Sequence, residues 1–138
     1  MHRDDINKLT SQSFEYDPTP NRKKHRWKKN VAGFANFFGQ MTGRCPNDIR
    51  LSEAQVLLND AVPDPPSPFD DDPYPKRLYN VFRGVVYVAI SSNFQMKYHA
   101  YPHRGVKKLA PATLRILEAR AVSSGYHKVF LKWSDEYA

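Results

Sequence analysis

The chain has 138 residues, 41% of them hydrophobic and 13% aromatic, so it is long enough for one core and too short for two ordinary domains. No apolar run reaches the roughly 18 to 20 residues of a membrane span, and the charged start lacks the apolar segment of a secretory signal. The net charge of +7 favours an anionic partner, which leaves nucleic acid, an anionic membrane surface and an acidic protein as candidates.

The single cysteine, Cys45, excludes an internal disulfide and a cysteine-based zinc site. A thiolate nucleophile needs a base or a cation beside it, and Cys45-Pro46 lies where a helix is expected to pass into a loop. We therefore expect a small buried residue and keep a nucleophile as the alternative.

Residues 1–21 are polar, with two prolines near their end, and are expected to form a loose arm. Residues 22–29 form the densest positive run of the chain, which includes His25. This run either contacts a polyanion or is a solvated surface segment, and both interpretations stay open. The residues that would bind nucleic acid are Arg22, Lys23, Lys24, Arg26, Trp27, Lys28 and Lys29.

Two helices are predicted in residues 22–62. Spacings of three and four place Trp27, Val31, Phe34, Phe38 and Met41 on one stripe, which predicts a helix over residues 27–42, although glycines within it weaken that prediction. A second helix is expected within residues 47–62. Its signals are a capping box of Ser52 and Gln55, a hydrophobic staple of Leu51 and Val56, and an apolar stripe of Ala54, Leu57, Leu58 and Ala61 ended by Pro63.

Residues 63–75 are too rich in proline for a helix or a central strand and are predicted to be an extended connector. The acidic run of Asp70 to Asp72 within it is expected to stay hydrated, because a hard cation needs oxygens that converge from a shaped loop. An alternative is that this acidic run faces a basic surface of the same chain. We predict neither a bound metal nor a cofactor.

Residues 78–90 are rich in Val, Tyr and Phe and predict two strands joined by a turn at Arg83-Gly84. A turn at residues 91–93 would lead into a third strand, giving an antiparallel meander. Helices are then predicted from Pro111 to the break at residues 123–125 and over residues 126–137, where a strand over 127–133 is the competing assignment. The order of elements predicts an α+β fold in a single domain, with the site in residues 76–138.

The third strand carries an unusual row of proton carriers. In an extended chain Lys97, His99, Tyr101 and His103 share one side, while Met96, Tyr98 and Ala100 share the other. In the preceding strand, Val86, Val88 and Ile90 lie on one face. Tyr87 lies on the other face and is flanked by Arg83 and Ser91. If the two polar rows merge, they form a patch of Arg83, Tyr87, Lys97, His99 and Tyr101.

This patch favours phosphodiester chemistry without a metal ion. The sequence lacks a glycine-rich phosphate loop, a serine-hydrolase elbow and the common zinc signatures, whereas RNA supplies its own nucleophile in the 2′-OH. His99 is the first candidate for acid–base work. Lys97, Arg83 or Arg104 would hold the phosphate, and Tyr101, Tyr87 or His103 would supply a second proton or stack on a base.

Residues 76–133 resemble the C-terminal toxin domains of bacterial polymorphic and contact-dependent toxin systems. The resemblance rests on Gly84-Val85-Val86-Tyr87, on Tyr98-His99-Ala100-Tyr101-Pro102 and on the helix opened by a proline, with Ala100 where glycine is more common. It implies a small α+β ribonuclease that acts in the cytosol of a target cell after delivery and is paired with an immunity protein, which we expect to be acidic. It also implies that His99 and Tyr101 are site residues supported by Tyr87.

Two alternatives stay open. A nucleic-acid-binding protein without catalysis would use the run 22–29 on phosphates and Trp27, Tyr98 or Tyr101 for stacking. A protein-interaction module for an acidic partner would need the positive charge and not the histidines.

Overall fold

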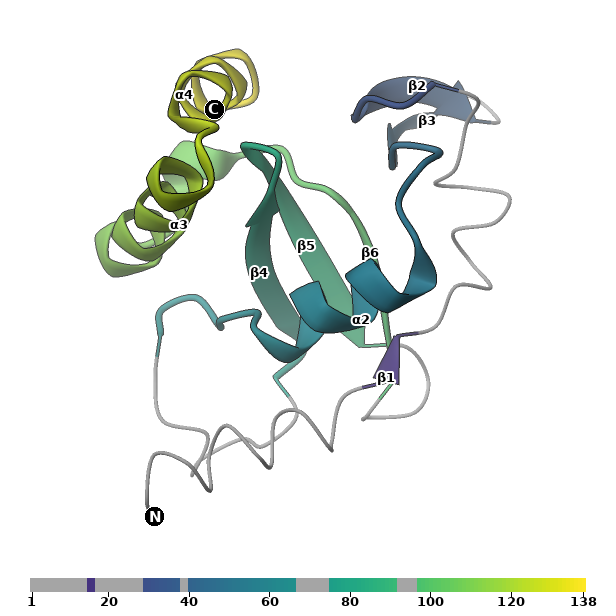
Figure 1. Ribbon diagram of the computed structural model, residues 1–138, viewed down its shortest axis with the longest axis horizontal. Helices are drawn as coiled ribbons and strands as arrows, with labels where there is room; N and C mark the ends of the chain where they lie inside the picture. Colours follow the sequence, from purple (N-terminus) through teal and green to yellow (C-terminus); the bar gives the residue numbers. More distant parts are fainter. Residues whose placement is uncertain (1–14, 17–28, 38–39, 67–74, 92–96) are drawn as a thin grey trace.

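A four-stranded sheet with helices on both faces and a separate two-stranded hairpin make up the part of the chain that the structure describes (Figure 1). This computed structural model describes residues 15–16, 29–37, 40–66, 75–91 and 97–138. The elements are β1 (Glu15–Tyr16), β2 (Gly33–Phe37), β3 (Gln40–Arg44), α2 (Leu51–Asn59), β4 (Arg77–Phe82), β5 (Val85–Ser91), β6 (Lys97–Pro102), the 3-10 turn η2 (Val106–Lys108), α3 (Pro111–Ser124) and α4 (His127–Glu136). The α+β class predicted from the sequence is confirmed.

The predicted antiparallel meander is confirmed as β4, β5 and β6. The order in the sheet is β1-β6-β5-β4, and β1 pairs in parallel with β6. The turn at Arg83-Gly84 joins β4 to β5 so that Phe82 lies opposite Val85. Both turn residues have a positive φ, 52° at Arg83 and 81° at Gly84, as a two-residue hairpin turn requires.

The register of the three antiparallel strands decides which residues share a face, because directly opposed residues point to the same side. One face, here called the histidine face, carries the row Arg77, Ile90 and His99 and the row Tyr79, Val88 and Tyr101. The other, here called the α2 face, carries Leu78, Ala89 and Ala100 in one row and Asn80, Tyr87 and Pro102 in another.

Helix α2 packs on the α2 face. Its residue Leu58, together with Ala61 beyond its end, forms an apolar cluster with Leu78, Ala89 and Tyr98, and the Tyr98 side chain is fully buried. The Tyr98 hydroxyl donates to the carbonyl of Pro75, so this tyrosine is a core residue. Cys45 is also buried and its thiol donates to the Ala100 carbonyl at 3.6 Å, which fits the expected structural role.

Helix α2 begins one residue before the predicted capping box. The Arg50 N–H donates to Glu53 Oε1 at 3.1 Å, so Glu53 performs the reciprocal capping that was predicted for Gln55. Gln55 instead accepts from the Tyr16 N–H at 3.0 Å and so joins β1 to α2. The predicted staple is wrong, because Leu51 and Val56 are 52% and 65% exposed.

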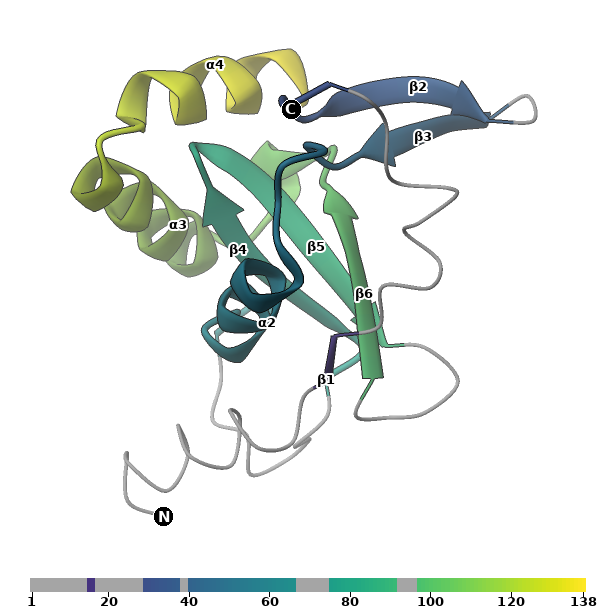
Figure 2. The same ribbon diagram turned by 45° about the vertical axis from the view of Figure 1, so that its right-hand side comes forward.

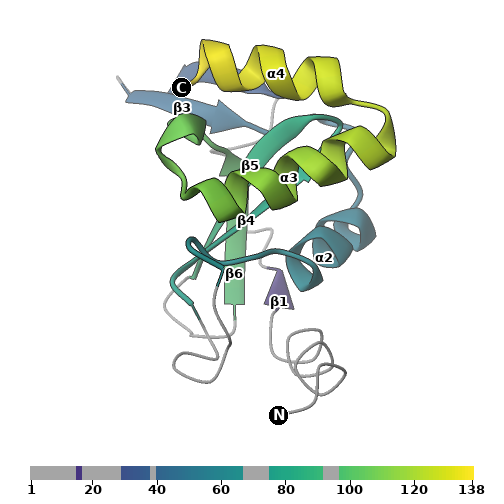
Figure 3. The same ribbon diagram turned by 90° about the vertical axis from the view of Figure 1, so that its left-hand side faces the viewer.

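Helices α3 and α4 cover one end of the histidine face. Leu117, Phe130 and Trp133 form a buried cluster with Val81 and Val86. Figure 3 shows α3 crossing the sheet with α4 beside it. Pro111 begins α3 and Gly125 ends it with a φ of 84°, as predicted, and the helix assignment for α4 is confirmed over the competing strand. Within the described ranges, no helix is long and apolar enough to cross a membrane.

The helix predicted over residues 27–42 is wrong: β2 and β3 form an antiparallel hairpin there. Tertiary contacts explain the difference. The Phe34 ring lies 5.7 Å from the Trp133 ring and 4.8 Å from that of Tyr137, so α4 and the residue after it supply the packing that the stripe pattern had assigned to a helix. Figure 2 shows β2 near the C-terminal end of α4. A Cβ on Gly43 would lie 3.0 Å from the Pro102 carbonyl, a close approach that favours glycine.

Candidate functional site

The part of the histidine face that α3 and α4 leave uncovered forms a cleft. Its floor is the outer half of β4, β5 and β6, and the β2–β3 hairpin forms a wall through Phe34 and Met41. The cleft has a volume of about 370 Å³. Its ionisable and proton-carrying side chains are Arg77, His99, Tyr101, His103 and Arg104.

Strand alternation brings His99 and Tyr101 of β6, and His103 just after it, to the same side. The His99 and Tyr101 rings are stacked with centroids 6.2 Å apart and an interplanar angle of 30°. The His103 ring meets Tyr79 edge to face at 5.1 Å. His103 lies beyond Pro102, at the end of β6, and it still faces the cleft because its N–H donates to the Val86 carbonyl at 2.8 Å and continues the pairing of the strand.

The C-terminal helix holds the turn that follows His103. The indole N–H of Trp133 donates to the His103 carbonyl at 3.1 Å. The N–H groups of Gly105 and Val106 both donate to the Tyr137 carbonyl, at 2.8 and 3.1 Å. Gly105 has a φ of 85°, which a residue with a side chain rarely adopts. The His103 backbone is therefore fixed by two distant segments of the chain.

Burial keeps the His103 imidazole neutral. Desolvation lowers its pKa from 6.5 to about 4, and the positive charge of Arg77 acts in the same direction, against a hydrogen bond to the Gly105 backbone and the charge of Asp64. At neutral pH this imidazole is therefore unprotonated and can accept a proton.

Tyr101 can act as a proton donor. Burial raises the pKa of its hydroxyl above the ordinary value of 10, Arg77 lowers it, and Tyr79 raises it. The net shift is upward, so the phenol keeps its proton at neutral pH. The cleft thus combines a proton acceptor and a proton donor with two guanidinium groups.

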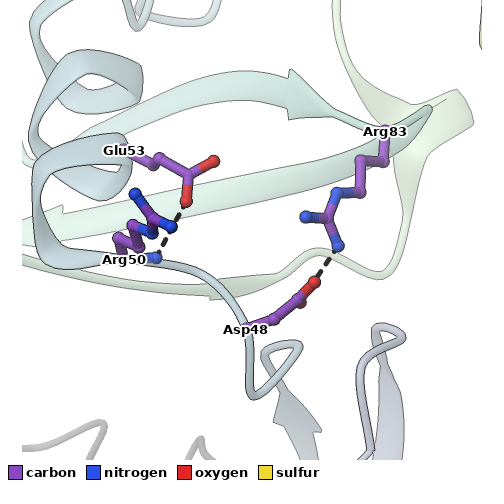
Figure 4. Close-up of polar contacts among 4 residues, drawn as sticks. All are labelled: Asp48, Arg50, Glu53 and Arg83. Atoms are coloured by element: carbon purple, nitrogen blue, oxygen red, sulfur yellow. Dashed lines mark hydrogen bonds and ion pairs between the residues drawn. The ribbon is translucent and has the colours of Figure 1, made fainter.

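Two residues predicted for the patch lie elsewhere, so the prediction that the two polar rows merge is wrong. Arg83 is at the β4–β5 turn, where its Nη1 forms an ion pair with Asp48 Oδ1 at 3.0 Å (Figure 4). Tyr87 lies opposite Pro102, which puts it on the α2 face, where it is 9% exposed. The register between β5 and β6 pairs the polar row of β6 with Val88 and Ile90 instead.

The remaining predicted residues divide into those in the cleft and those outside it. Arg104 is exposed and its guanidinium carbon lies 5.3 Å from the centre of the Phe34 ring, over the cleft. Lys97 shares the side of His99 by alternation but is not one of the described residues that line the cleft. Of the basic run, only Lys29 is described, and its carbonyl accepts the Asn47 N–H at 2.8 Å. Residues 22–28, which include Trp27, and Asp70 to Asp72 lie outside the described residues.

The sequence analysis did not find Arg77 or Tyr79, although the signal was present. A two-residue turn at 83–84 fixes the register of β4 on β5 and places Arg77 opposite Ile90. Because Ile90 lies opposite His99, Arg77 and His99 then share a face. Following the predicted turn through the whole hairpin would have added Arg77 to the site.

In the described part of the chain, no three His, Cys, Asp or Glu side chains form a group that could hold a metal ion. Comparison with known proteins found no matching family model, no matching curated protein and no matching solved structure.

Proposed function

We propose that the protein is an endoribonuclease that cleaves single-stranded RNA by transesterification without a metal cofactor. The observation that carries the proposal is the cleft itself, which two imidazoles and a phenol line together with Arg77 and Arg104. RNA is the substrate because its 2′-OH provides the nucleophile, so the protein has only to move protons and stabilise charge.

His103 is the general base of this mechanism. As a neutral imidazole it takes the proton of the 2′-OH, whose oxygen attacks the adjacent phosphorus and forms the 2′,3′-cyclic phosphate. The bond from phosphorus to the 5′ oxygen breaks, and that oxygen takes a proton from His99. Both ring nitrogens of an imidazolium carry a proton, so a protonated His99 can supply it. The anionic phosphate bound beside His103 raises the pKa of that imidazole, which makes it a stronger base in the complex.

The two arginines hold the phosphate and offset its growing charge. Both are exposed at the cleft and can approach the phosphate oxygens in the bidentate manner that guanidinium groups allow. Tyr101, which keeps its proton, donates a hydrogen bond to the same oxygens or stacks on a base.

The test is digestion of total RNA in the presence of EDTA. The wild-type protein and the variant His127→Ala should degrade the RNA, whereas His99→Ala and His103→Gln should reduce the rate by about 100-fold or more, the usual contribution of a general acid or base. His127 is a suitable control because its imidazole pairs with Glu118 at 2.7 Å, outside the cleft. Intact RNA with the wild-type protein contradicts the proposal.

A nucleic-acid-binding role without catalysis is the second candidate, favoured by the same exposed arginines beside aromatic rings. It predicts that RNA binding depends on salt and that no cleavage products form. It also predicts that His99→Ala leaves RNA binding unchanged. Binding and cleavage measured on one RNA therefore distinguish the two functions.

We also propose that the ribonuclease acts as a toxin in the bacterial cytosol and is neutralised by an acidic immunity protein. The support is the resemblance of residues 76–133 to bacterial toxin domains, together with a cationic cleft that an acidic inhibitor would cover. Expression in a bacterial cytosol should stop growth, and His99→Ala should restore it. Equal growth arrest by both proteins contradicts a toxic ribonuclease.

A further inference from the structure

The cleft is one of two adjoining pockets. The second pocket has a volume of about 480 Å³ and lies toward the end of α4, where Tyr79, Lys108, Glu136 and Tyr137 line it. His103 and Arg104 line both pockets. Volumes of about 370 and 480 Å³ fall within the range of roughly 300 to 1,000 Å³ that small-molecule pockets occupy, so each pocket is large enough for one nucleoside.

The charges of the two pockets differ. The first contains Arg77 and Arg104, and among the described residues that line it there is no carboxylate. The second contains the carboxylates of Asp64 and Glu136 beside Lys108. A phosphate is therefore attracted more strongly to the first pocket and to the boundary at Arg104 than to the rest of the second pocket, where Asp64 and Glu136 offset the charge of Lys108.

The two carboxylates of the second pocket are not equally available. Asp64 Oδ1 already accepts the Ala110 N–H at 2.8 Å and the Thr113 hydroxyl at 2.6 Å, which ties it to the start of α3. Glu136 is exposed at the end of α4, where it forms a side-chain hydrogen bond with Tyr137. A carboxylate has two oxygens and accepts several hydrogen bonds, so Glu136 can accept a further one from a ligand.

Each pocket also offers aromatic surface. Tyr101 and Phe34 line the first, and Tyr79 and Tyr137 line the second. Stacking of a base on an aromatic ring contributes roughly 1 to 3 kcal/mol, and it does not depend strongly on which base is bound.

From these observations, and resting on the proposed ribonuclease function, we propose that the two pockets are subsites for the two nucleosides that flank the scissile phosphate. The phosphate lies at the boundary, between His103 and Arg104. The base in the second pocket donates its exocyclic amino group to Glu136, so adenine, cytosine and guanine are preferred there over uracil, which has no such group. The minimal substrate is therefore a dinucleotide of single-stranded RNA with a selected base on one side.

The first experiment measures kcat/KM for short RNA substrates in which one nucleoside flanking the cleaved bond is replaced by an abasic ribose. This replacement keeps the attacking 2′-OH and the leaving 5′ oxygen. Loss of the base on either side should lower kcat/KM by about tenfold, as expected for one lost stacking contact. Loss on only one side, or on neither, overturns the two-subsite arrangement while the ribonuclease function stands. An absence of cleavage for every RNA rejects the proposed function itself.

The second experiment assigns the base preference to Glu136. Glu136→Gln should reduce the discrimination against uracil at one flanking position by at least about fivefold and leave the other position unchanged, because an amide can both donate and accept. Glu118→Gln is the matched control, since Glu118 pairs with His127 away from the cleft. Equal preferences in the wild-type protein, Glu136→Gln and Glu118→Gln overturn the assignment of Glu136.

Discussion

His103 combines a buried position with an ionisable ring, and the two properties have opposite effects. Burial between Tyr79 and the turn at Gly105 orients the imidazole, yet it lowers the pKa of that imidazole to about 4 because the charged form loses solvent. In the proposed function, a phosphate held by Arg77 and Arg104 would offset this loss. The burial that orients His103 would then make its protonation depend on substrate.

The lowered pKa of His103 makes stability depend on pH. The imidazole of the unfolded chain has a pKa near 6.5 and binds a proton that the folded chain excludes down to about pH 4. The stabilising contribution of neutral His103 is therefore present above pH 6.5. It is lost as the pH falls from 6.5 to about 4. At roughly 1.4 kcal/mol per pKa unit, reduced by partial exposure of the ring, the loss is on the order of 2 kcal/mol. Urea unfolding at pH 7 and pH 4.5 should show a smaller decrease for His103→Gln than for the wild type. Equal decreases contradict the assignment.

Tyr87 illustrates how a tyrosine in a promising sequence context can be structural. Its hydroxyl is buried on the α2 face, and no described residue forms a hydrogen bond with it. Burial, with a contribution from Cys45, raises the pKa of this hydroxyl well above 10. An unsatisfied buried hydroxyl destabilises a fold by roughly 1 to 3 kcal/mol.

Tyr87→Phe should therefore raise the free energy of unfolding by about 1 kcal/mol and, in the proposed function, leave the ribonuclease activity unchanged. Tyr101→Phe, which removes the hydroxyl in the cleft, should lower kcat instead. Denaturant titration and RNA cleavage of both variants provide the measurement. A loss of activity in Tyr87→Phe that matches the loss in Tyr101→Phe would show that the hydroxyl of the α2 face serves the reaction.

Among the elements, the β4–β5 hairpin sets the geometry of the site, because its turn fixes the register that brings Arg77 and Tyr79 to the histidine face. Gly84 in this turn packs directly against α4: an added Cβ would lie 2.7 Å from Val129 Cβ and 2.8 Å from the Tyr126 carbonyl. The turn thus joins the sheet to the helix that also holds His103.

Gly84→Ala should lower the free energy of unfolding by about 3 kcal/mol, the sum of backbone strain at a φ of 81° and overpacking against α4. Gly125→Ala is the matched control: its φ is 84° but no atom lies within 4 Å of the added Cβ, so only the strain of about 1 kcal/mol remains. Chemical denaturation compares the two variants. If Gly84→Ala loses no more stability than Gly125→Ala, the contact between the turn and α4 relaxes without a cost in free energy.

Local patterns predicted the elements whose stabilising contacts are near in sequence. The β4–β5 hairpin, with its turn at Arg83 and Gly84, and helices α2, α3 and α4 all followed from periodicity, turn residues or proline and glycine signals. The β2–β3 hairpin did not, because Phe34 packs on Trp133 and Tyr137, about a hundred positions later in the chain. The site followed the same rule. Alternation placed His99 and Tyr101 on the same face correctly. Tyr87 was misassigned because no two-residue turn signal fixes the register of β6 on β5, and the observed register pairs Tyr87 with Pro102.

At the scale of the whole molecule, the net charge of +7 raises the question of where RNA beyond the cleft would bind. The cleft holds two arginines, which in the proposed function would contact one or two phosphates. Of the densest positive run, residues 22–29, all but Lys29 lie outside the described residues, so the contribution of the run has to be measured. Counterion release makes the salt dependence of binding the appropriate observable, because each phosphate neutralised on a single strand adds about 0.7 to the slope.

Replacing Lys23, Lys24, Lys28 and Lys29 with glutamine should flatten the plot of log K against log salt by up to about 3, if each lysine neutralises one phosphate. The control replaces four exposed lysines of the described chain and removes the same charge. They are Lys76, Lys107, Lys128 and Lys132. If the run binds the RNA backbone, the first variant loses more slope than the control. Both variants keep the wild-type kcat at saturating RNA if the run binds RNA beyond the scissile phosphate, because the control lysines do not line the cleft. Equal slopes for the two variants mean that the run acts only through net charge, and a lower kcat in the first means that it reaches the scissile phosphate.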